Sequence, residues 1–222
     1  MSGKLIVIEG LDGSGKATQS KLLLESLRAK GVRCEALSFP CYDEEYSALV
    51  RMYLGGRFGD KPGDVNCYAA SVFYAVDRYA SYKTSWLKGY EEGTVYLADR
   101  YTTSNAVYQT SKLPENEWDA FLDWLYDFEY NKLGIPAPDR VIYLDVQPEL
   151  SETLMAKRYA GDETKKDIHE KDIEYQRRSR AAAKYCAEKQ GWHIVECGEG
   201  GVMRSIEDIS RDLLSAVIGV TE

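Results

Sequence analysis

The chain of 222 residues is 44% hydrophobic and 29% charged, and its formal net charge is −8 at pH 7. The negative charge argues against a nucleic-acid-binding protein, because nucleic acids are bound through clustered Lys and Arg side chains. No apolar run approaches the roughly 20 residues that a membrane helix requires. We therefore expect a globular protein with no membrane span, folded as a single domain over residues 1–222, since no Pro-, Gly- or Ser-rich linker divides the sequence.

The N-terminus and the cysteines indicate a cytoplasmic protein. Residues 1–4 lack the long apolar stretch of a signal peptide. The five cysteines are odd in number and show no C-x-x-C spacing, so we expect reduced thiols rather than disulfides or a thiolate metal site.

The stretch from Lys4 to Thr18, K-L-I-V-I-E-G-L-D-G-S-G-K-A-T, carries the strongest local signal. Residues 4–8 are mostly apolar and β-branched, which predicts a buried strand. The glycines that follow let the backbone curl and direct successive N–H groups at a phosphate, and Lys16 adds a mobile positive charge. The spacing G-x-x-x-x-G-K between a strand and a helix therefore predicts a nucleotide-binding phosphate loop. Its predicted binding residues are Gly10, Leu11, Asp12, Gly13, Ser14, Gly15, Lys16, Ala17 and Thr18.

One position departs from the phosphate-loop pattern. Ala17 stands where a Ser or Thr hydroxyl would normally bind Mg²⁺, and Thr18 comes one residue later. A metal ion there must rely on water, phosphate oxygens or carboxylates, which suits Mg²⁺ because it keeps several waters.

Strands and helices are expected to alternate along the rest of the chain. The first helix should place Leu22, Leu23 and Leu27 on its inner face and end at Gly31. Further strands are expected at residues 33–39, 94–98, 140–146 and 192–197, and further helices at 42–59, 66–88, around 118–125, 149–158, 170–189 and 205–217. This order predicts a parallel sheet covered by helices on both faces.

The third expected strand ends in Asp99-Arg100-Tyr101. Ligands of open parallel sheets bind at the carboxyl ends of the strands, so this charged pair is a candidate site.

The chain resembles the thymidylate kinase family nearly from end to end. The resemblance rests on the phosphate loop, on F-Y-A-V-D-R at 73–78, on D-R-Y-T-T-S-N-A-V-Y at 99–108, on G-I-P-x-P-D at 134–139 and on D-I-H-E-K-D-I-E-Y at 167–175. It implies a three-layer α/β sandwich of the P-loop nucleoside monophosphate kinase type, with a five-stranded parallel sheet. It also implies phosphoryl transfer from ATP to dTMP with Mg²⁺, by an enzyme that acts as a homodimer, with Trp118 or the apolar surface near Phe73 as candidate contacts.

The resemblance also implies a role for individual residues. The catalytic residues would be Lys16, Asp99, Arg100 and Asp12, of which Asp99 and Asp12 would hold Mg²⁺. Tyr74 would stack on thymine and Arg78 would donate to the base, while Arg100 and Tyr42 would contact the acceptor phosphate. Ser104, Asn105 and Tyr108 would complete the acceptor site, Asn105 and Tyr108 lining the sugar, with Tyr108 crowding the 2′ carbon and so favouring deoxyribose.

Two departures from the family shift the expected source of positive charge. Cys41 follows the Phe-Pro break where some members have an arginine, so another basic residue such as Arg51 would have to replace that contact. Gly13 stands where some members carry an arginine in the phosphate loop, a pattern associated with basic residues in the lid. We therefore expect a mobile lid at about 158–170, closing over ATP and excluding water, with Arg158 stacking on adenine.

Other interpretations remain open at this stage. Tyr74 taken alone fits a core position, and Asp77-Arg78 taken alone fits a surface ion pair. The acceptor could be another nucleoside or deoxynucleoside monophosphate, and Ala17 leaves room for a non-catalytic nucleotide-binding module. A switch GTPase is disfavoured because Asn131-Lys132-Leu133-Gly134 lacks the aspartate of N-K-x-D.

Overall fold

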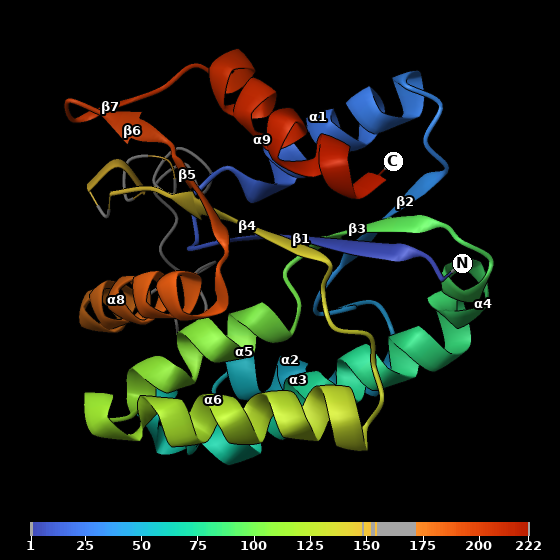
Figure 1. The fold of residues 1–222 in the computed structure, drawn as a ribbon. Coiled ribbons are helices and arrows are strands. Elements are labelled where there is room, and N and C mark those ends of the chain that lie inside the picture. Colours follow the sequence, from blue (N-terminus) through green and yellow to red (C-terminus); the bar gives the residue numbers. More distant parts are fainter. Residues whose placement is uncertain (1, 148, 152–153, 155–171, 222) are drawn as a thin grey trace.

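The computed structural model describes residues 2–147, 149–151, 154 and 172–221. A parallel sheet of five strands lies at its centre, in the order β2-β3-β1-β4-β5 (Figure 1). The strands are β1 (Lys4–Gly10), β2 (Cys34–Ser38), β3 (Val95–Asp99), β4 (Arg140–Asp145) and β5 (His193–Glu196). Helices cover both faces of the sheet, so the predicted three-layer arrangement is confirmed.

The central strand β1 shows why the sheet needs both helical layers. Its side chains alternate between two hydrophobic cores, with Leu5 and Val7 in one and Ile6 and Ile8 in the other. All four are fully buried. Because successive side chains of a strand point to opposite faces, an apolar run of this kind is stable only between two layers.

The two helical layers come from different parts of the chain. On one face lie α1 (Lys16–Ala29) and α9 (Ile206–Thr221) (Figure 1). The other face is covered by α2 (Ala48–Leu54), α3 (Cys67–Ser81), α5 (Thr102–Tyr108), α6 (Trp118–Tyr126) and α8 (Ile173–Gln190), with α4 (Leu87–Glu91) leading into β3. Short 3₁₀ turns at Glu45–Ser47, Pro62–Asp64, Thr110–Lys112 and Glu115–Glu117 connect these helices.

Helix α1 follows the prediction with one shift. Leu23 and Leu27 are fully buried as expected, but Leu24 rather than Leu22 completes the contact with the core. Gly31 adopts a left-handed φ of 82°, and the N–H of Val32 donates to Leu27 O at 3.1 Å. This glycine turn ends the helix near the predicted position.

The expected long helix over 66–88 is three segments in the structure. Helix α3 ends at Ser81, a π-helical turn spans Tyr82–Trp86, and α4 follows. A second π-helical segment, Asp127–Lys132, extends α6. The 3.6-residue periodicity of the sequence cannot reveal these wider turns, because the aromatic residues around them satisfy either spacing.

A small hairpin of β6 (Gly198–Glu199) and β7 (Val202–Met203) was not predicted. Gly200 and Gly201 form its turn with φ values of 58° and 78°. Two adjacent glycines between short strands are a hairpin signal that the sequence did contain.

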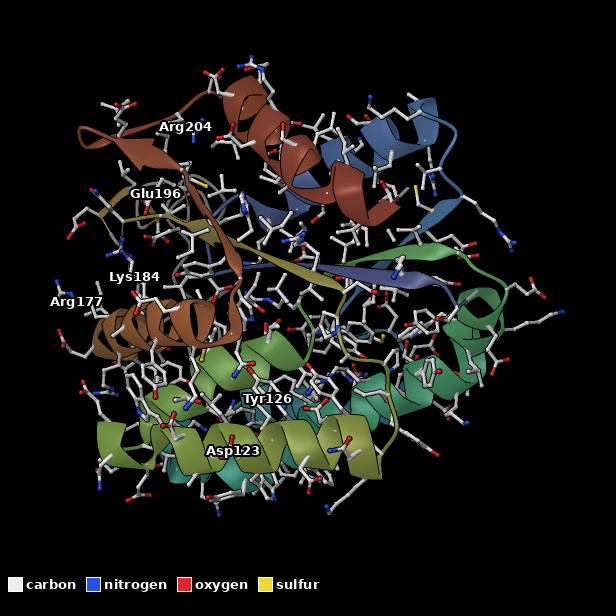
Figure 2. The ribbon with its side chains drawn as sticks, viewed as in Figure 1. Asp123, Tyr126, Arg177, Lys184, Glu196 and Arg204 are labelled. Atoms are coloured by element: carbon white, nitrogen blue, oxygen red, sulfur yellow. The ribbon has the colours of Figure 1, made fainter. Side chains whose placement is uncertain are left out.

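Helix α8 is anchored to the sheet by charge. The buried Asp145, at the end of β4, accepts from Arg180 Nε and Nη2 at 2.9 Å each, and Lys184 Nζ lies 2.9 Å from its Oδ2. Figure 2 shows Lys184 on the side of α8 nearest the sheet. The whole of the predicted lid, 158–170, including Arg158, lies outside the described residues, as does part of the helix expected at 149–158. None of the helices in the described part of the chain is long and apolar enough to cross a membrane.

Candidate active site

A cavity of about 640 Å³ opens at the carboxyl ends of β1, β2 and β3. Its walls are formed by the phosphate loop, the turn after β2 and the end of β3 with α5, together with side chains of α2 and α3. Its lining contains the predicted residues Asp12, Gly13, Ser14, Gly15, Lys16, Ala17, Thr18, Tyr42, Tyr74, Asp99, Arg100, Ser104, Asn105 and Tyr108. The sheet therefore brings together residues that are up to 96 positions apart in the sequence.

The phosphate loop has the geometry that its glycines predict. A side chain at Gly10 would place its Cβ 2.5 Å from Ser14 Oγ and 3.1 Å from Leu144 O, so the close approach requires glycine. Gly15 caps α1 with a φ of 85°, a left-handed conformation that other residues rarely adopt. The N-terminus of α1 consequently faces the cavity and favours a bound anion there.

Lys16 lies at the floor of this loop. Its Nζ donates to the carbonyls of Gly10 and Leu11 at 2.8 Å each, and only 7% of the residue is exposed. Burial, followed by repulsion from Arg100, lowers the pKa of Lys16 to about 8. The Lys16 ammonium is thus held within the phosphate loop, where its charge would attract the phosphates of a bound nucleotide.

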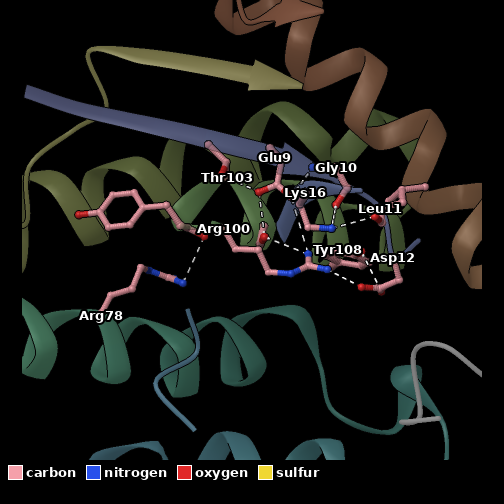
Figure 3. Close-up of polar contacts among 11 residues, drawn as sticks. Glu9, Gly10, Leu11, Asp12, Lys16, Arg78, Arg100, Thr103 and Tyr108 are labelled. Atoms are coloured by element: carbon pink, nitrogen blue, oxygen red, sulfur yellow. Dashed lines mark hydrogen bonds and ion pairs between the residues drawn. The ribbon is translucent and has the colours of Figure 1, made fainter. Parts of the chain in front are cut away.

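Arg100 is the positive centre of the opposite wall. It has a φ of 67°, and its N–H donates to Ile8 O at 3.1 Å. A positive φ in a residue other than glycine costs roughly 1–2 kcal/mol and is often found at functional sites. Here it turns the side chain back toward the phosphate loop, where Nη2 pairs with Asp12 Oδ1 and Nη1 lies 3.7 Å from Glu9 Oε1 (Figure 3). Burial opposes its charge, yet Tyr108, Asp12 and Glu9 raise the pKa of Arg100 well above its ordinary value.

Asp12 and Tyr108 form the remainder of this wall. The Tyr108 hydroxyl donates to Asp12 Oδ2 at 3.1 Å, and the Arg100 guanidinium lies over the Tyr108 ring at 5.3 Å. Burial, with the Asp12 charge, raises the pKa of Tyr108 well above its ordinary value, so the hydroxyl remains a donor. Asp12 therefore serves Arg100 and Tyr108 as an acceptor.

Glu9 is a member of this network that the sequence reasoning missed. It is fully buried, with Oε1 accepting from the N–H of Gly10 at 2.9 Å and Oε2 accepting from the hydroxyls of Thr103 and Ser104 at 2.7 and 2.8 Å. These bonds join the phosphate loop to α5 through one carboxylate. A glutamate at the end of an otherwise apolar buried strand is the signal that would have pointed to it.

Two predicted base contacts occupy different surroundings. Tyr74 lines the cavity and packs edge-on against Tyr53, with ring centroids 6.2 Å apart. Arg78 is 2% exposed and is not among the described residues that line the cavity. It instead donates to both carboxylate oxygens of Glu129, from Nε at 2.7 Å and from Nη2 at 2.5 Å.

Asp77, the neighbour of Arg78 on α3, holds the turn after β2. Cys41 N–H donates to Asp77 Oδ1 and Oδ2 at 3.2 and 3.1 Å, and Asp77 is 1% exposed. Burial raises the pKa of Asp77, and the Cys41 N–H opposes that rise. Tyr42, the next residue, lines the cavity. This contact between α3 and the turn was not predicted.

The cavity also contains residues that the sequence reasoning did not select. They are Ser38, Phe39, Pro40, Leu54, Gln109 and Leu154. Gln109 is 1% exposed, and its Oε1 has no hydrogen-bond partner among the described residues. It directly follows α5 and lies one helical turn after Asn105, and this spacing was the signal that could have found it.

Comparison with known proteins agrees with this geometry. The family model described as Thymidylate kinase matches residues 8–209. The chain belongs to the thymidylate kinase family. Curated relatives include thymidylate kinase of Mycobacterium tuberculosis, 35% identical over 85% of this chain and 87% of that protein, and a probable thymidylate kinase of Pyrococcus horikoshii, 32% identical over 98% and 97%.

A solved thymidylate kinase structure supports the fold. The enzyme from Candida albicans superposes with a TM-score of 0.73 over 100% of this chain and 94% of its own, at 21% identity. At that identity the likeness shows the shared fold.

Cys41 stands where the family resemblance led us to expect an arginine. Arg51, which we expected to replace an arginine there, donates from Nη1 to the carbonyls of Tyr42 at 2.5 Å and Glu44 at 2.7 Å. It is not among the described lining residues. Arg51 therefore supports the backbone of the turn that carries Tyr42.

The residues of this thymidylate kinase family member fit a magnesium ion. Asp99 Oδ1 and Ser14 Oγ are buried without a hydrogen-bond partner in the described part of the chain, and both residues line the cavity. A carboxylate and a hydroxyl oxygen suit Mg²⁺. No group of three His, Cys, Asp or Glu side chains converges among the described residues, so water and phosphate oxygens would have to complete the coordination.

Proposed function

We propose that the protein transfers the terminal phosphoryl group of ATP to dTMP, giving ADP and dTDP. The supporting observation is that the phosphate loop and the Arg100 wall line a single cavity, so that a donor and an acceptor phosphate can meet end to end. Phosphoryl transfer needs little covalent chemistry from the protein and depends mainly on positioning and charge stabilisation. The chain supplies both through Lys16 and Arg100.

The proposed donor site is the phosphate loop. Its N–H groups and the start of α1 bind the phosphates of ATP, and Lys16 exchanges the carbonyls of Gly10 and Leu11 for phosphate oxygens. Asp99 and Asp12 are proposed to hold Mg²⁺, with the Ser14 hydroxyl oxygen as a ligand in place of the hydroxyl that Ala17 lacks. Mg²⁺ when bound neutralises charge on the transferred phosphate. The contact proposed for Arg158 with adenine falls outside the described residues.

The proposed acceptor site is the opposite wall. Arg100, already held by Asp12 and Glu9, grips the phosphate of dTMP, and Tyr42 and Ser104 adjoin it. Tyr108, fixed by its bond to Asp12, narrows the space beside the sugar and so favours deoxyribose.

Thymine is proposed to lie between Tyr74 and Asn105. Asn105 uses its amide nitrogen to donate to Ser71 O and to Glu129 Oε1, both at 3.1 Å. The group that it can offer to a ligand is therefore its carbonyl oxygen, which accepts from the N3–H of thymine. Arg78, although buried, is held beside Asn105 by the same glutamate and is proposed to donate to the base from there.

The experiment is a coupled assay of ADP release with ATP and Mg²⁺ against dTMP, dUMP, UMP, dCMP, dGMP and AMP. We expect dTMP to give the highest kcat/KM. A preference for another monophosphate would overturn the base assignment, and no acceptor-dependent turnover would overturn the kinase assignment in favour of a binding module.

We further propose that the protein acts as a homodimer. Trp118 is turned inward, with 7% exposed and Nε1 donating to Leu113 O at 3.0 Å. Helix α3 instead presents Tyr68, Val76 and Tyr79, which are 44%, 42% and 39% exposed and share one helical face. Multi-angle light scattering of the wild type and of Val76→Glu tests this, with a dimer expected only for the wild type.

A cytoplasmic location is proposed from the thiols. Cys34, Cys41, Cys67, Cys186 and Cys197 are all free in the structure. Unpaired cysteines are typical of proteins in a reducing compartment. Fractionation of cells that produce the protein would test the location.

A further inference from the structure

Glu129 is a buried carboxylate behind the acceptor wall. It lies in the π-helical segment Asp127–Lys132 and is fully buried. Its Oε2 accepts from Arg78 Nε and Thr102 Oγ1 at 2.7 Å each, and its Oε1 accepts from Arg78 Nη2 at 2.5 Å and Asn105 Nδ2 at 3.1 Å. Every oxygen of the carboxylate is thus used by donors from α3 and α5.

The Asn105 amide has a fixed orientation as a result. Both partners of its Nδ2, the Ser71 carbonyl and the Glu129 carboxylate, are acceptors with no hydrogen to give. If the amide turned over, its oxygen would face two other oxygens, and two hydrogen bonds would become two repulsive contacts. The structure therefore keeps the nitrogen toward Glu129.

This orientation matters for the choice of base. At N3, thymine carries a hydrogen-bond donor, whereas cytosine carries an acceptor. An Asn105 amide that offers only its oxygen accepts a hydrogen bond from the N3–H of thymine, whereas the same oxygen is repelled by the N3 acceptor of cytosine. A fixed polar group of this kind discriminates strongly, because the wrong partner leaves it buried and unsatisfied.

We propose that Glu129 is a positioning residue that sets the pyrimidine preference by holding Asn105 with its carbonyl oxygen toward the base. The inference rests on the proposed dTMP kinase function and extends it to a residue outside the cavity. Arg78 forms an ion pair with Glu129 and so compensates the charge of this buried carboxylate.

The variant that tests this is Glu129→Asp. The long Arg78 side chain can follow a carboxylate that is withdrawn by one methylene, whereas the short Asn105 side chain cannot. The ion pair therefore survives while the Asn105 bond is lost. The ratio of kcat/KM for dTMP to that for dCMP is measured with both acceptors in one reaction, so that the folded fraction of the preparation cancels.

We expect Glu129→Asp to lower this ratio by about tenfold, the equivalent of one hydrogen bond. The matched control is Thr102→Val, which removes a different bond to Glu129 and should leave the ratio within about twofold. In an Asn105→Ala background, Glu129→Asp should change the ratio by less than about twofold, because the residue through which it acts is absent.

Three results would overturn the proposal. The kcat/KM values for dTMP and dCMP could fall together in Glu129→Asp, which would leave their ratio unchanged. Thr102→Val could lower the ratio as far as Glu129→Asp does. The effect of Glu129→Asp on the ratio could also persist in the Asn105→Ala background. Failure of the proposed function is a separate result, because it would appear in the wild type as the absence of a preference for dTMP over dCMP.

Discussion

Asp77-Arg78 and Asp99-Arg100 are the same dipeptide in two backbone settings, the interior of a helix and the end of a strand. On α3, Asp77 holds the Cys41 turn and Arg78 is saturated by the two oxygens of Glu129. After β3, Asp99 keeps an oxygen without a partner among the described residues, and Arg100 divides its guanidinium between Asp12 and Glu9. Side-chain exposure follows this division, at 2% for Arg78 and 19% for Arg100.

The difference shows which of the two arginines can exchange partners. A guanidinium that donates to both oxygens of one buried carboxylate is strongly held there. Breaking this ion pair costs much free energy, because two charges would remain uncompensated. A guanidinium that is shared between a partly exposed Asp12 and a more distant Glu9 can accept a phosphate in addition. We therefore expect the Asp77-Arg78 pair to keep its protein partners during the reaction and the Asp99-Arg100 pair to exchange them.

The largest expected effect follows from removing the second arginine. Arg100→Met should lower kcat/KM by about 10²–10³-fold, the usual loss when one charge-stabilising donor is removed. Steady-state kinetics with dTMP and ATP measures it. A loss smaller than about tenfold would contradict the assignment of Arg100 to the acceptor phosphate.

Removing the first arginine, Arg78, should have its main effect on the stability of the fold. Arg78→Met leaves Glu129 buried and unpaired, and it should lower the free energy of unfolding by about 3–5 kcal/mol. Urea denaturation of this variant beside Arg100→Met provides the comparison. If Arg78→Met unfolds at the wild-type midpoint, the two arginines do not differ in the way proposed.

The two aspartates sharpen the comparison further. Asp99→Asn removes the charge of the oxygen proposed for Mg²⁺ and should weaken the response to Mg²⁺ by about 10–100-fold. Activity measured against Mg²⁺ concentration gives the half-saturation point. Asp77→Asn is the control, and its half-saturation should match the wild type because Asp77 faces the Cys41 turn.

A smaller effect is expected from loosening that turn. Asp77→Ala removes the acceptor of the Cys41 N–H and should raise KM for dTMP by about 2–10-fold, the equivalent of one hydrogen bond, with kcat changed less. Asp77→Asn should restore KM because it keeps an acceptor oxygen. An equal rise in both variants would mean that the charge of Asp77, rather than the hydrogen bond, holds the turn.

The last expected effect concerns pH. The pKa of Lys16 is lowered to about 8 from 10.5, so between these values the unfolded chain binds more protons than the folded one. The Lys16 contribution to the free energy of unfolding should therefore rise with pH across this window. Denaturation of the wild type and Lys16→Met from pH 7 to 10 measures it. Because Arg100 contributes to the lowering of the Lys16 pKa, Arg100→Met should raise the pH at which this window begins. An unchanged starting pH would contradict the electrostatic coupling between Arg100 and Lys16.

The phosphate loop, the strands and part of the candidate site could be predicted from the sequence, because each depends on residues that are close together in the chain. The phosphate loop is a run of consecutive residues whose glycines and Lys16 need no distant partner to be recognised. The five strands follow from apolar runs between breakers, and the ends of parallel strands share one edge, so Asp99 and Arg100 could be assigned to a site before any coordinates.

Only the tertiary structure decided how the buried charges pair. Arg78 and Glu129 are 51 positions apart, and Thr103 and Glu9 are 94 apart, so no local pattern links them. Helical spacing placed Arg78 one turn after Tyr74 and suggested a shared target, whereas only the packing of α3 against the π-helical segment Asp127–Lys132 gave Arg78 a buried carboxylate as partner. A carboxylate can be buried only where folding delivers its donors, and for this reason Glu9 and Glu129 could not be assigned from the sequence alone.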